Sequence, residues 1–127
     1  MGMRKIIFRG FSKYLCEWVY GDLEHVKQDH VRIWPLHASK DNRADDVSPE
    51  SVGQYTGLKD SKGHEIYEGD IVKNVNGFRE EFGQVAQVKF NDRHCAFMLF
   101  YPDGDCIPMD AERQYEIVGN SYENPNS

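Results

Sequence analysis

Closely spaced turn residues between positions 54 and 120 constrain this chain most, because they leave room for short strands and not for long helices. Turn-forming residues recur at 60–63, 76–77, 91–93 and 102–105, and β-branched and aromatic residues fill the segments between them. This spacing predicts a mainly β fold, built as a small antiparallel barrel or sandwich. Residues 68–72 are typical of the start of a strand in an SH3-like barrel.

Two segments of this region are expected to form its core. Residues 83–90 alternate between apolar and polar side chains, which predicts a strand with one buried face. Residues 94–101 are apolar on both faces, which predicts a strand at the centre of the sheet. On this interpretation, Phe97→Ala should lower the free energy of unfolding by about 3–5 kcal/mol.

The first 53 residues are expected to form an N-terminal β-hairpin extension and a polar loop that pack on the body. Residues 4–11 and 14–20 are predicted strands, residues 22–30 are polar with a short helical turn, and residues 37–51 are a loop. A short helix is predicted to start near Ser48, because serine followed by proline suits a helix start. The predicted units are therefore 1–53 and 54–127, the second a β-barrel domain with a docked C-terminal tail.

The charge of the chain argues against a function in nucleic-acid binding. The net charge is −6, and residues 101–127 alone hold six acidic side chains against one basic one. The four basic side chains among residues 1–20 are too few and too dispersed to form a phosphate-binding arm. Overall acidity disfavours tight binding to a phosphate backbone.

The cysteines predict a reducing environment. Cys16, Cys95 and Cys106 are odd in number and show no CxxC spacing, so free thiols in the cytoplasm are expected, with Cys95 and Cys106 in the core. His25, His30 and His37 lack the short spacing of zinc ligands. We therefore expect no disulfide, no metal and no cofactor. The N-terminus lacks the apolar core of a signal peptide, which also favours the cytoplasm.

Three sequence blocks, in this order, carry a family resemblance. They are RKIIFRGF at 4–11, QYTGLKD with EIYEGDIV across 54–72, and YEIVGN with YENP across 115–125. Their order and spacing resemble the YopX family, found largely in phages and prophages, although that family often has tryptophan at the position of Phe11. Residues 12–53 match poorly. The resemblance implies a β-rich fold and a phage-encoded accessory role, and it implies no catalytic residues.

The turn Tyr67-Glu68-Gly69-Asp70 is the first candidate site. Its carboxylates could serve a small hydrolase, but acid–base catalysis needs two carboxyls held in one cleft. A structural role is the stronger interpretation: Gly69 would adopt a backbone conformation that a Cβ strains, and Asp70 would accept backbone hydrogen bonds.

Aromatic residues and the C-terminal tail supply two further candidates. Trp18, Trp34 and Tyr55 could form an aromatic surface for bases or a partner protein, although core packing is the ordinary role of such rings. Tyr122, Glu123 and Asn124 are expected to dock the tail on the body, with Tyr122 as the anchor.

These observations predict a non-enzymatic accessory protein that binds another macromolecule, with protein favoured over nucleic acid and no membrane partner. Self-association is a further expectation, because small β folds leave edge strands that need cover. A nucleic-acid-binding β-barrel is the alternative, and a hydrolase using Glu68 and Asp70 is the third hypothesis.

Overall fold

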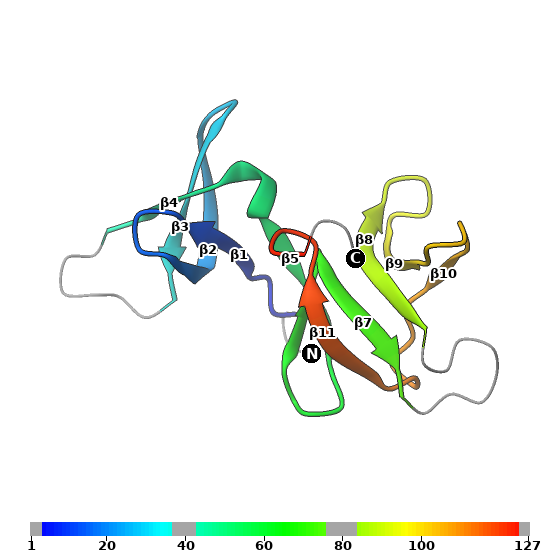
Figure 1. Ribbon diagram of the computed structural model, residues 1–127. Helices are drawn as coiled ribbons and strands as arrows, with labels where there is room; N and C mark the ends of the chain where they lie inside the picture. Colours follow the sequence, from blue (N-terminus) through cyan, green and yellow to red (C-terminus); the bar gives the residue numbers. More distant parts are fainter. Residues whose placement is uncertain (1–3, 37–42, 76–83, 125–127) are drawn as a thin grey trace. The chain divides into compact units, whose positions relative to one another are not determined.

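The computed structural model describes residues 4–36, 43–75 and 84–124, and these segments are almost entirely β-structure (Figure 1). The strands are β1 (Phe8–Ser12), β2 (Glu17–Lys27), β3 (His30–Pro35), β4 (Asp45–Val47), β5 (Gly53–Lys59), β6 (Glu65–Tyr67), β7 (Asp70–Asn74), β8 (Val85–Asn91), β9 (Ala96–Phe100), β10 (Cys106–Pro108) and β11 (Tyr115–Asn120). One 3₁₀ turn, η1 (Pro49–Ser51), joins β4 to β5. No helix within these three segments is long and apolar enough to span a membrane.

The strands form two antiparallel sheets. One sheet has the order β4-β3-β2-β1-β5-β6 and the other has the order β10-β9-β8-β7-β11. The chain divides into two compact units, residues 1–55 and 56–127, and β5 runs through the division. The sequence predicts either a barrel or a sandwich. The structure has the sandwich-like architecture, because neither sheet closes into a barrel.

The N-terminal unit, residues 1–55, is a curled sheet with a small core on its inner side. The Ser48 N–H donates to the Phe11 carbonyl oxygen at 2.9 Å, so the chain after β4 returns to β1. A Cβ on Gly10 would lie only 2.6 Å from Val47 Cγ2, which explains why glycine stands at this close approach. The buried core residues are Val19, Val31, Ile33 and Val47.

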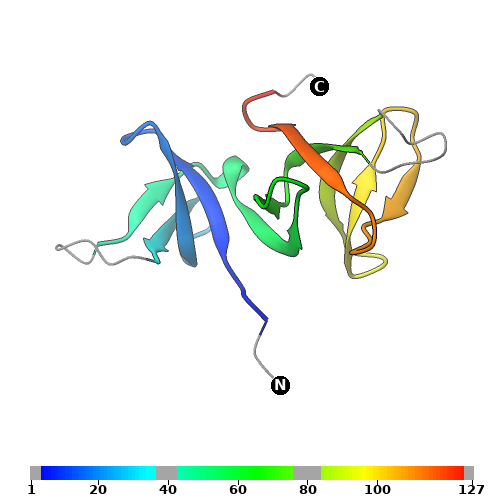
Figure 2. The same ribbon diagram turned by 90° about the horizontal axis from the view of Figure 1, so that it is seen from below.

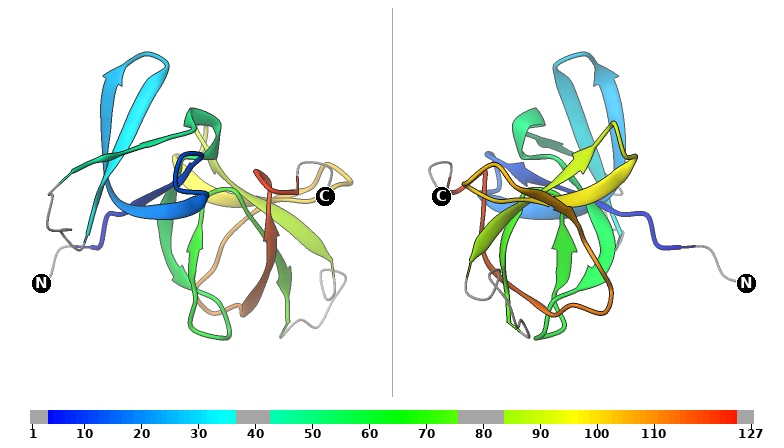
Figure 3. Two further views of the ribbon diagram at one scale, coloured as in Figure 1. Left: turned by 60° about the vertical axis from the view of Figure 1, so that its left-hand side comes forward. Right: turned by 90° about the vertical axis from the view of Figure 1, so that its right-hand side faces the viewer.

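The N-terminal unit contains more strand than the sequence predicts. The segment 22–30 belongs mostly to β2, which extends to Lys27 and pairs with β3, and Figure 3 shows the two strands as one long hairpin in blue and cyan. The prediction of a helical turn there is wrong, because Leu23 packs with Ile33 on the inner side while the polar residues face outward. Within the predicted loop 37–51, residues 45–47 form β4, and the short helix expected near Ser48 is present as η1.

The C-terminal unit, residues 56–127, holds the larger core. Ile66 from β6 packs with Val72, Val88, Leu99 and Tyr115 from the five-stranded sheet, and Leu58 from β5 lies against the same cluster. Every one of these side chains comes from a different strand. The core therefore depends on pairing that only the folded sheet establishes.

The central strand of the five-stranded sheet is β8, and the prediction that residues 94–101 lie at its centre needs correction. β9 begins at Ala96 and lies between β8 and the short edge strand β10. Phe97 is half-buried and contacts Phe90 edge-on, with ring centroids 5.3 Å apart. Phe97 lies on the same face of β9 as the core residue Leu99, and Met98 on the other face is buried too, so burial falls off toward the start of the strand.

Two further predictions concern turns. One of them is wrong, and the other lies outside the described residues. His94 and Cys95 lie in the turn before β9, and Cys95 is exposed rather than buried in the core. Cys106 is partly buried. The predicted hairpin turn at 76–77 lies outside the described residues.

Candidate functional site

The turn at residues 67–70 has the structural geometry that the sequence predicts. Gly69 has a φ of 98°, in the left-handed region where a Cβ is strained. Its N–H donates to the Val88 carbonyl oxygen at 2.8 Å. Asp70 is only 2% exposed, and its Oδ2 accepts a hydrogen bond from the Tyr67 N–H at 2.8 Å. The carboxylate of Asp70 therefore holds the turn at the start of β7.

The C-terminal tail turns back on the end of β11, next to this same turn. The Ser121 N–H donates to the Gly69 carbonyl oxygen at 2.7 Å, and Asn120 pairs with Asp70 across β11 and β7. The Glu123 N–H donates to Asn120 Oδ1 at 2.8 Å, so residues 121–124 form a closed turn, shown in red after β11 in Figure 2. A backbone hydrogen bond thus joins Gly69 to Ser121, which is 52 residues further along the chain.

A third residue of the tail completes this arrangement. The Asn124 N–H donates to the Asn120 carbonyl oxygen at 2.8 Å, and a Cβ on Gly119 would lie 2.8 Å from Asn124 Oδ1. Tyr122 is partly buried, and whether it anchors the tail stays a prediction. Residues of the closing sequence block, 115–125, therefore hold the end of β11 and the turn that follows it together.

Asp60 is a buried carboxylate that sequence reasoning placed in a turn without a role. Its Oδ1 accepts from the N–H groups of Lys62 and His64, and its Oδ2 accepts from the Ile117 N–H at 3.2 Å. Burial on its own raises the pKa of Asp60, but the backbone donors of His64, Ile117 and Lys62 outweigh it, so the pKa is lowered. Asp60 thereby ties the β5–β6 turn to β11. The only signal in the sequence was an aspartate at a turn start, which does not reveal the distant partner.

Aromatic side chains gather on the outer face of the N-terminal sheet. Residues directly opposite in an antiparallel pair share a face, and the register pairs Phe11 with Trp18, Arg9 with Tyr20 and Asp22 with Trp34. The outer face, as used below, consists of Arg9, Phe11, Trp18, Tyr20, Asp22, Glu24, Arg32 and Trp34. It lies opposite the core of the unit, because side chains alternate along each strand.

Two aromatic rings on the outer face are open to solvent. Tyr20 is 42% exposed and Trp34 is 38% exposed. Asp22, the partner of Trp34, lies two residues beyond Tyr20 on β2, so the two rings are diagonal neighbours. Of the predicted aromatic surface, the structure thus places Trp34 and the partly buried Trp18 on one face and adds Tyr20.

Hydrogen bonds fix the orientation of Trp34. Its Nε1–H donates to Glu24 Oε1 at 2.9 Å, and the Arg32 Nε–H donates to the same oxygen at 2.8 Å. The hydrogen bonds from Arg32 and then Trp34 lower the pKa of Glu24. Because Glu24 stays ionised and holds the indole N–H, Trp34 presents its ring without an unsatisfied polar group.

Cations lie over two further aromatic rings of the unit, Trp18 and Tyr55. The Arg9 guanidinium carbon lies 4.6 Å from the Trp18 ring centroid, and Phe11 meets Trp18 edge-on at 5.5 Å. Tyr55 is 8% exposed, with Lys5 Nζ 5.9 Å from its ring centroid. Tyr55 is therefore a packing residue and does not extend the exposed surface that the sequence predicts.

Titratable side chains elsewhere in the described segments do not assemble a metal centre. Within residues 4–36, 43–75 and 84–124, no group of three or more His, Cys, Asp or Glu side chains is placed to hold a metal ion. His30 Nε2 lies 2.8 Å from Asp46 Oδ1, and His25 lies elsewhere along β2. Cys16 and Cys95 are exposed free cysteines in hairpin turns.

The architecture and the comparisons together define the class. The chain is a small all-β protein whose antiparallel strands form two sheets, with a single 3₁₀ turn among the described residues. The family model for the YopX protein matches residues 7–127, so the chain belongs to the YopX family. No curated protein sequence matches it.

A solved structure shares the fold. The crystal structure of protein EF1440 from Enterococcus faecalis is similar, with a TM-score of 0.56 and 21% sequence identity over 98% of each chain. At this identity, the likeness shows the fold alone.

Proposed function

We propose that this protein is a non-enzymatic binding module that recognises another protein through the outer face of its N-terminal unit. The observation that carries the proposal is the pair of exposed rings, Tyr20 and Trp34, on a rigid hairpin. Tryptophan, tyrosine and arginine dominate the binding energy of protein interfaces, because they bury large areas in a fixed geometry. The Glu24 hydrogen bond holds the Trp34 indole in place before any partner arrives, which reduces the entropy lost on binding.

The charges on the outer face favour a protein partner over nucleic acid. Arg9 and Arg32 are offset there by Asp22 and Glu24, and Glu24 is already paired with Arg32. Single-stranded nucleic acid needs stacked rings beside a positive groove, and this balance of charge does not supply one. A protein surface with its own mixed charges and an apolar contact suits the face better.

The geometry of the candidate carboxylates supports a non-enzymatic role. Asp70 is buried and accepts a hydrogen bond from its own turn, and Asp60 is buried and accepts three backbone hydrogen bonds. A buried Asp70 whose carboxylate already holds its own turn speaks against the hydrolase hypothesis that uses Glu68 and Asp70, and so supports the proposal.

The family resemblance and the cysteines suggest the setting of this function. We place the protein in the host cytoplasm as a phage or prophage accessory protein, since three free thiols suit a reducing compartment. Self-association through the same face is the other use that exposed rings could have, and the test below includes it.

Capture from induced host cells, followed by reconstitution with purified components, tests the proposal. The double variant Tyr20→Ala/Trp34→Ala should lose the captured protein, and Tyr14→Ala should retain it. Tyr14 is a matched control, because it is 94% exposed in the same unit but lies in the turn between β1 and β2, off the outer face. Circular dichroism should show that all variants stay folded.

Three outcomes would contradict the proposal. Capture that nuclease abolishes would point to nucleic acid, and capture that the double variant retains would remove the outer face from the interaction. A wild-type protein that forms only a homodimer by light scattering, with dissociation by the double variant, would replace the foreign partner with a second copy of the chain.

A further inference from the structure

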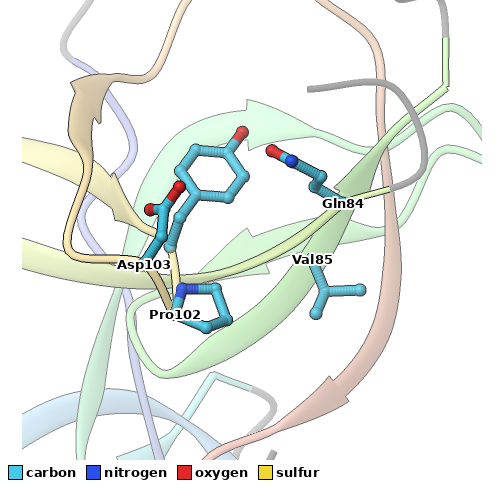
Figure 4. A pocket seen from close by; sticks show the side chains of 5 residues that line it. Gln84, Val85, Pro102 and Asp103 are labelled. Atoms are coloured by element: carbon cyan, nitrogen blue, oxygen red, sulfur yellow. The ribbon is translucent and has the colours of Figure 1, made fainter. Parts of the chain in front are cut away.

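A small cavity lies at one end of the five-stranded sheet in the C-terminal unit, away from the residues used above. Its volume is about 230 Å³, and its lining residues are Gln84, Val85, Tyr101, Pro102 and Asp103 (Figure 4). β8 and β9 are antiparallel, and Gln87 pairs with Phe100, so the residues that begin β8 lie beside those that follow β9. Sheet register therefore brings together two segments that are about 16 residues apart.

The loop that supplies most of the lining is fixed by its own hydrogen bonds. The Tyr101 N–H donates to the Asp105 carbonyl oxygen at 2.9 Å, and the Gly104 N–H donates to the Tyr101 carbonyl oxygen at 3.0 Å. Gly104 has a φ of 97°, which a glycine adopts without strain. Asp103 Oδ1 accepts from the Asp105 N–H at 2.9 Å, so the turn also orients this carboxylate. A cavity wall held in this way is formed before a ligand binds.

The lining combines an apolar wall with polar groups at one side. Val85 and Pro102 supply apolar surface, Tyr101 supplies an aromatic side chain, and Asp103 and Gln84 supply a carboxylate and an amide. In Figure 4 the polar ends of Asp103 and Gln84 lie on the same side of the cavity, while Val85 and Pro102 lie on the other. Tyr101 is 8% exposed and packs in the core of the unit, so the Asp103 carboxylate and the Gln84 amide, rather than an open ring face, are the groups that attract a cation.

Charge and size narrow the class of ligand. Residues 56–127 contain seven basic and thirteen acidic side chains, so the unit attracts cations and repels anions. The volume of about 230 Å³ equals roughly eight water molecules at about 30 Å³ each, which is less than a drug-sized ligand requires. It suits a single side chain or a comparably small cation.

We propose that this cavity binds a guanidinium group, as carried by an arginine side chain of a partner protein or by a small free guanidine. The planar head packs against Pro102 and Val85 and donates to Asp103, and a further N–H of the head donates to the Gln84 amide oxygen. The guanidinium fits better than an ammonium, because its donors lie in one plane and can reach the carboxylate and the amide oxygen together.

Amide-detected NMR titration of the whole chain tests this with defined probes. Capped arginine (N-acetyl-arginine methylamide) should shift the amide signals of Val85, Tyr101 and Asp103 saturably, in the millimolar range. Capped citrulline has the same shape without the charge, and it should bind up to about fivefold more weakly, as expected for the loss of one exposed ion pair. Ethylguanidinium distinguishes the two sources: equal affinity indicates a free guanidine, and tighter binding of capped arginine indicates a protein side chain.

Two variants locate the binding. Asp103→Asn should weaken capped arginine by about fivefold while keeping the fold, because its amide oxygen can still accept from the Asp105 N–H. Asp92→Asn removes the same charge from an exposed turn outside the cavity and should leave the affinity unchanged. Equal binding of citrulline and arginine, unchanged affinity in Asp103→Asn, or shifts that do not saturate would each overturn the proposal.

Discussion

The N-terminal and C-terminal units differ in how many large apolar side chains they expose and in their net charge. Nine large hydrophobic side chains of the described residues are exposed, and seven of them belong to the N-terminal unit: Ile6, Tyr14, Leu15, Tyr20, Val26, Trp34 and Leu36. That unit also has eight basic and eight acidic side chains, whereas the C-terminal unit carries the whole net charge of −6. The C-terminal unit buries its apolar residues in the larger core.

This difference predicts that the two units contribute differently to the stability of the fold and to the binding of a partner. Burial of apolar area stabilises a fold, while exposed aromatic area on a rigid strand stabilises nothing until a partner covers it. Substitutions in the C-terminal unit should therefore change the free energy of unfolding, and substitutions on the outer face of the N-terminal unit should change binding.

Leu99→Ala should produce the largest loss of stability. Leu99 is 1% exposed at the centre of the C-terminal core, so the truncation removes buried surface and leaves a cavity, at a cost of about 3–4 kcal/mol. Phe97→Ala, two residues before Leu99, should cost only about 1–2 kcal/mol, because Phe97 is only partly buried. Urea unfolding of the two variants measures both values, and equal losses would contradict the placement of Phe97.

Asp60→Asn should cost about 2–3 kcal/mol at neutral pH, because an NH₂ group would face a backbone donor and the charge-assisted hydrogen bonds would be lost. The wild-type stability should also fall in acid. The folded-state pKa of Asp60 lies below its ordinary value of about 3.9, so its contribution is complete above that pH and disappears as the pH falls through the lower folded-state pKa.

Unfolding of the wild type and of Asp60→Asn at pH 7, 4 and 3 checks this sign. The difference between the two proteins should hold down to about pH 4 and shrink below it. A difference that grows in acid would show that the Asp60 pKa is raised by burial.

Gly69→Ala and Asp70→Ala should each lower the free energy of unfolding by about 1–3 kcal/mol, through backbone strain and a lost buried hydrogen bond. Gly63→Ala is a useful comparison, since Gly63 has a φ of 87° with nothing within 4 Å of an added Cβ, so its cost is strain alone. Thermal melts of the three variants measure these losses. Full stability with loss of partner capture would make the 67–70 turn a binding site.

Trp34→Ala should have the smallest effect on stability, about 0.5–1 kcal/mol, because the ring packs on one side only. Its effect on partner affinity should be larger, about 2 kcal/mol or more if Trp34 is a central contact. Melting and binding measured on the same samples compare the two, and a stability loss that accounts for the whole binding loss would contradict the division between the units.

The sequence predicted those features that local chemistry determines. Gly69 needed positive φ at a sharp turn, proline after Ser48 began a short helical turn, and the alternation in 83–90 predicted the half-buried strand that the structure has as β8. The prediction was wrong where pairing with a distant strand determines the local structure. Residues 22–30 predict a polar segment with a helical turn, but pairing with β3 holds most of them in β2. The central strand was predicted at 94–101, but β8 occupies the centre.

By itself, then, the sequence determined the β class, the turns and the likeness to the YopX family, because each depends on residues that are close together along the chain. Only the tertiary structure decided which of those residues meet. It joined Ser121 to Gly69, carried the Asp60 carboxylate to Ile117, and placed Trp34 beside Tyr20 on the outer face. The physical reason is that strand pairing satisfies backbone hydrogen bonds between distant segments, and the register that results sets the face on which every side chain lies.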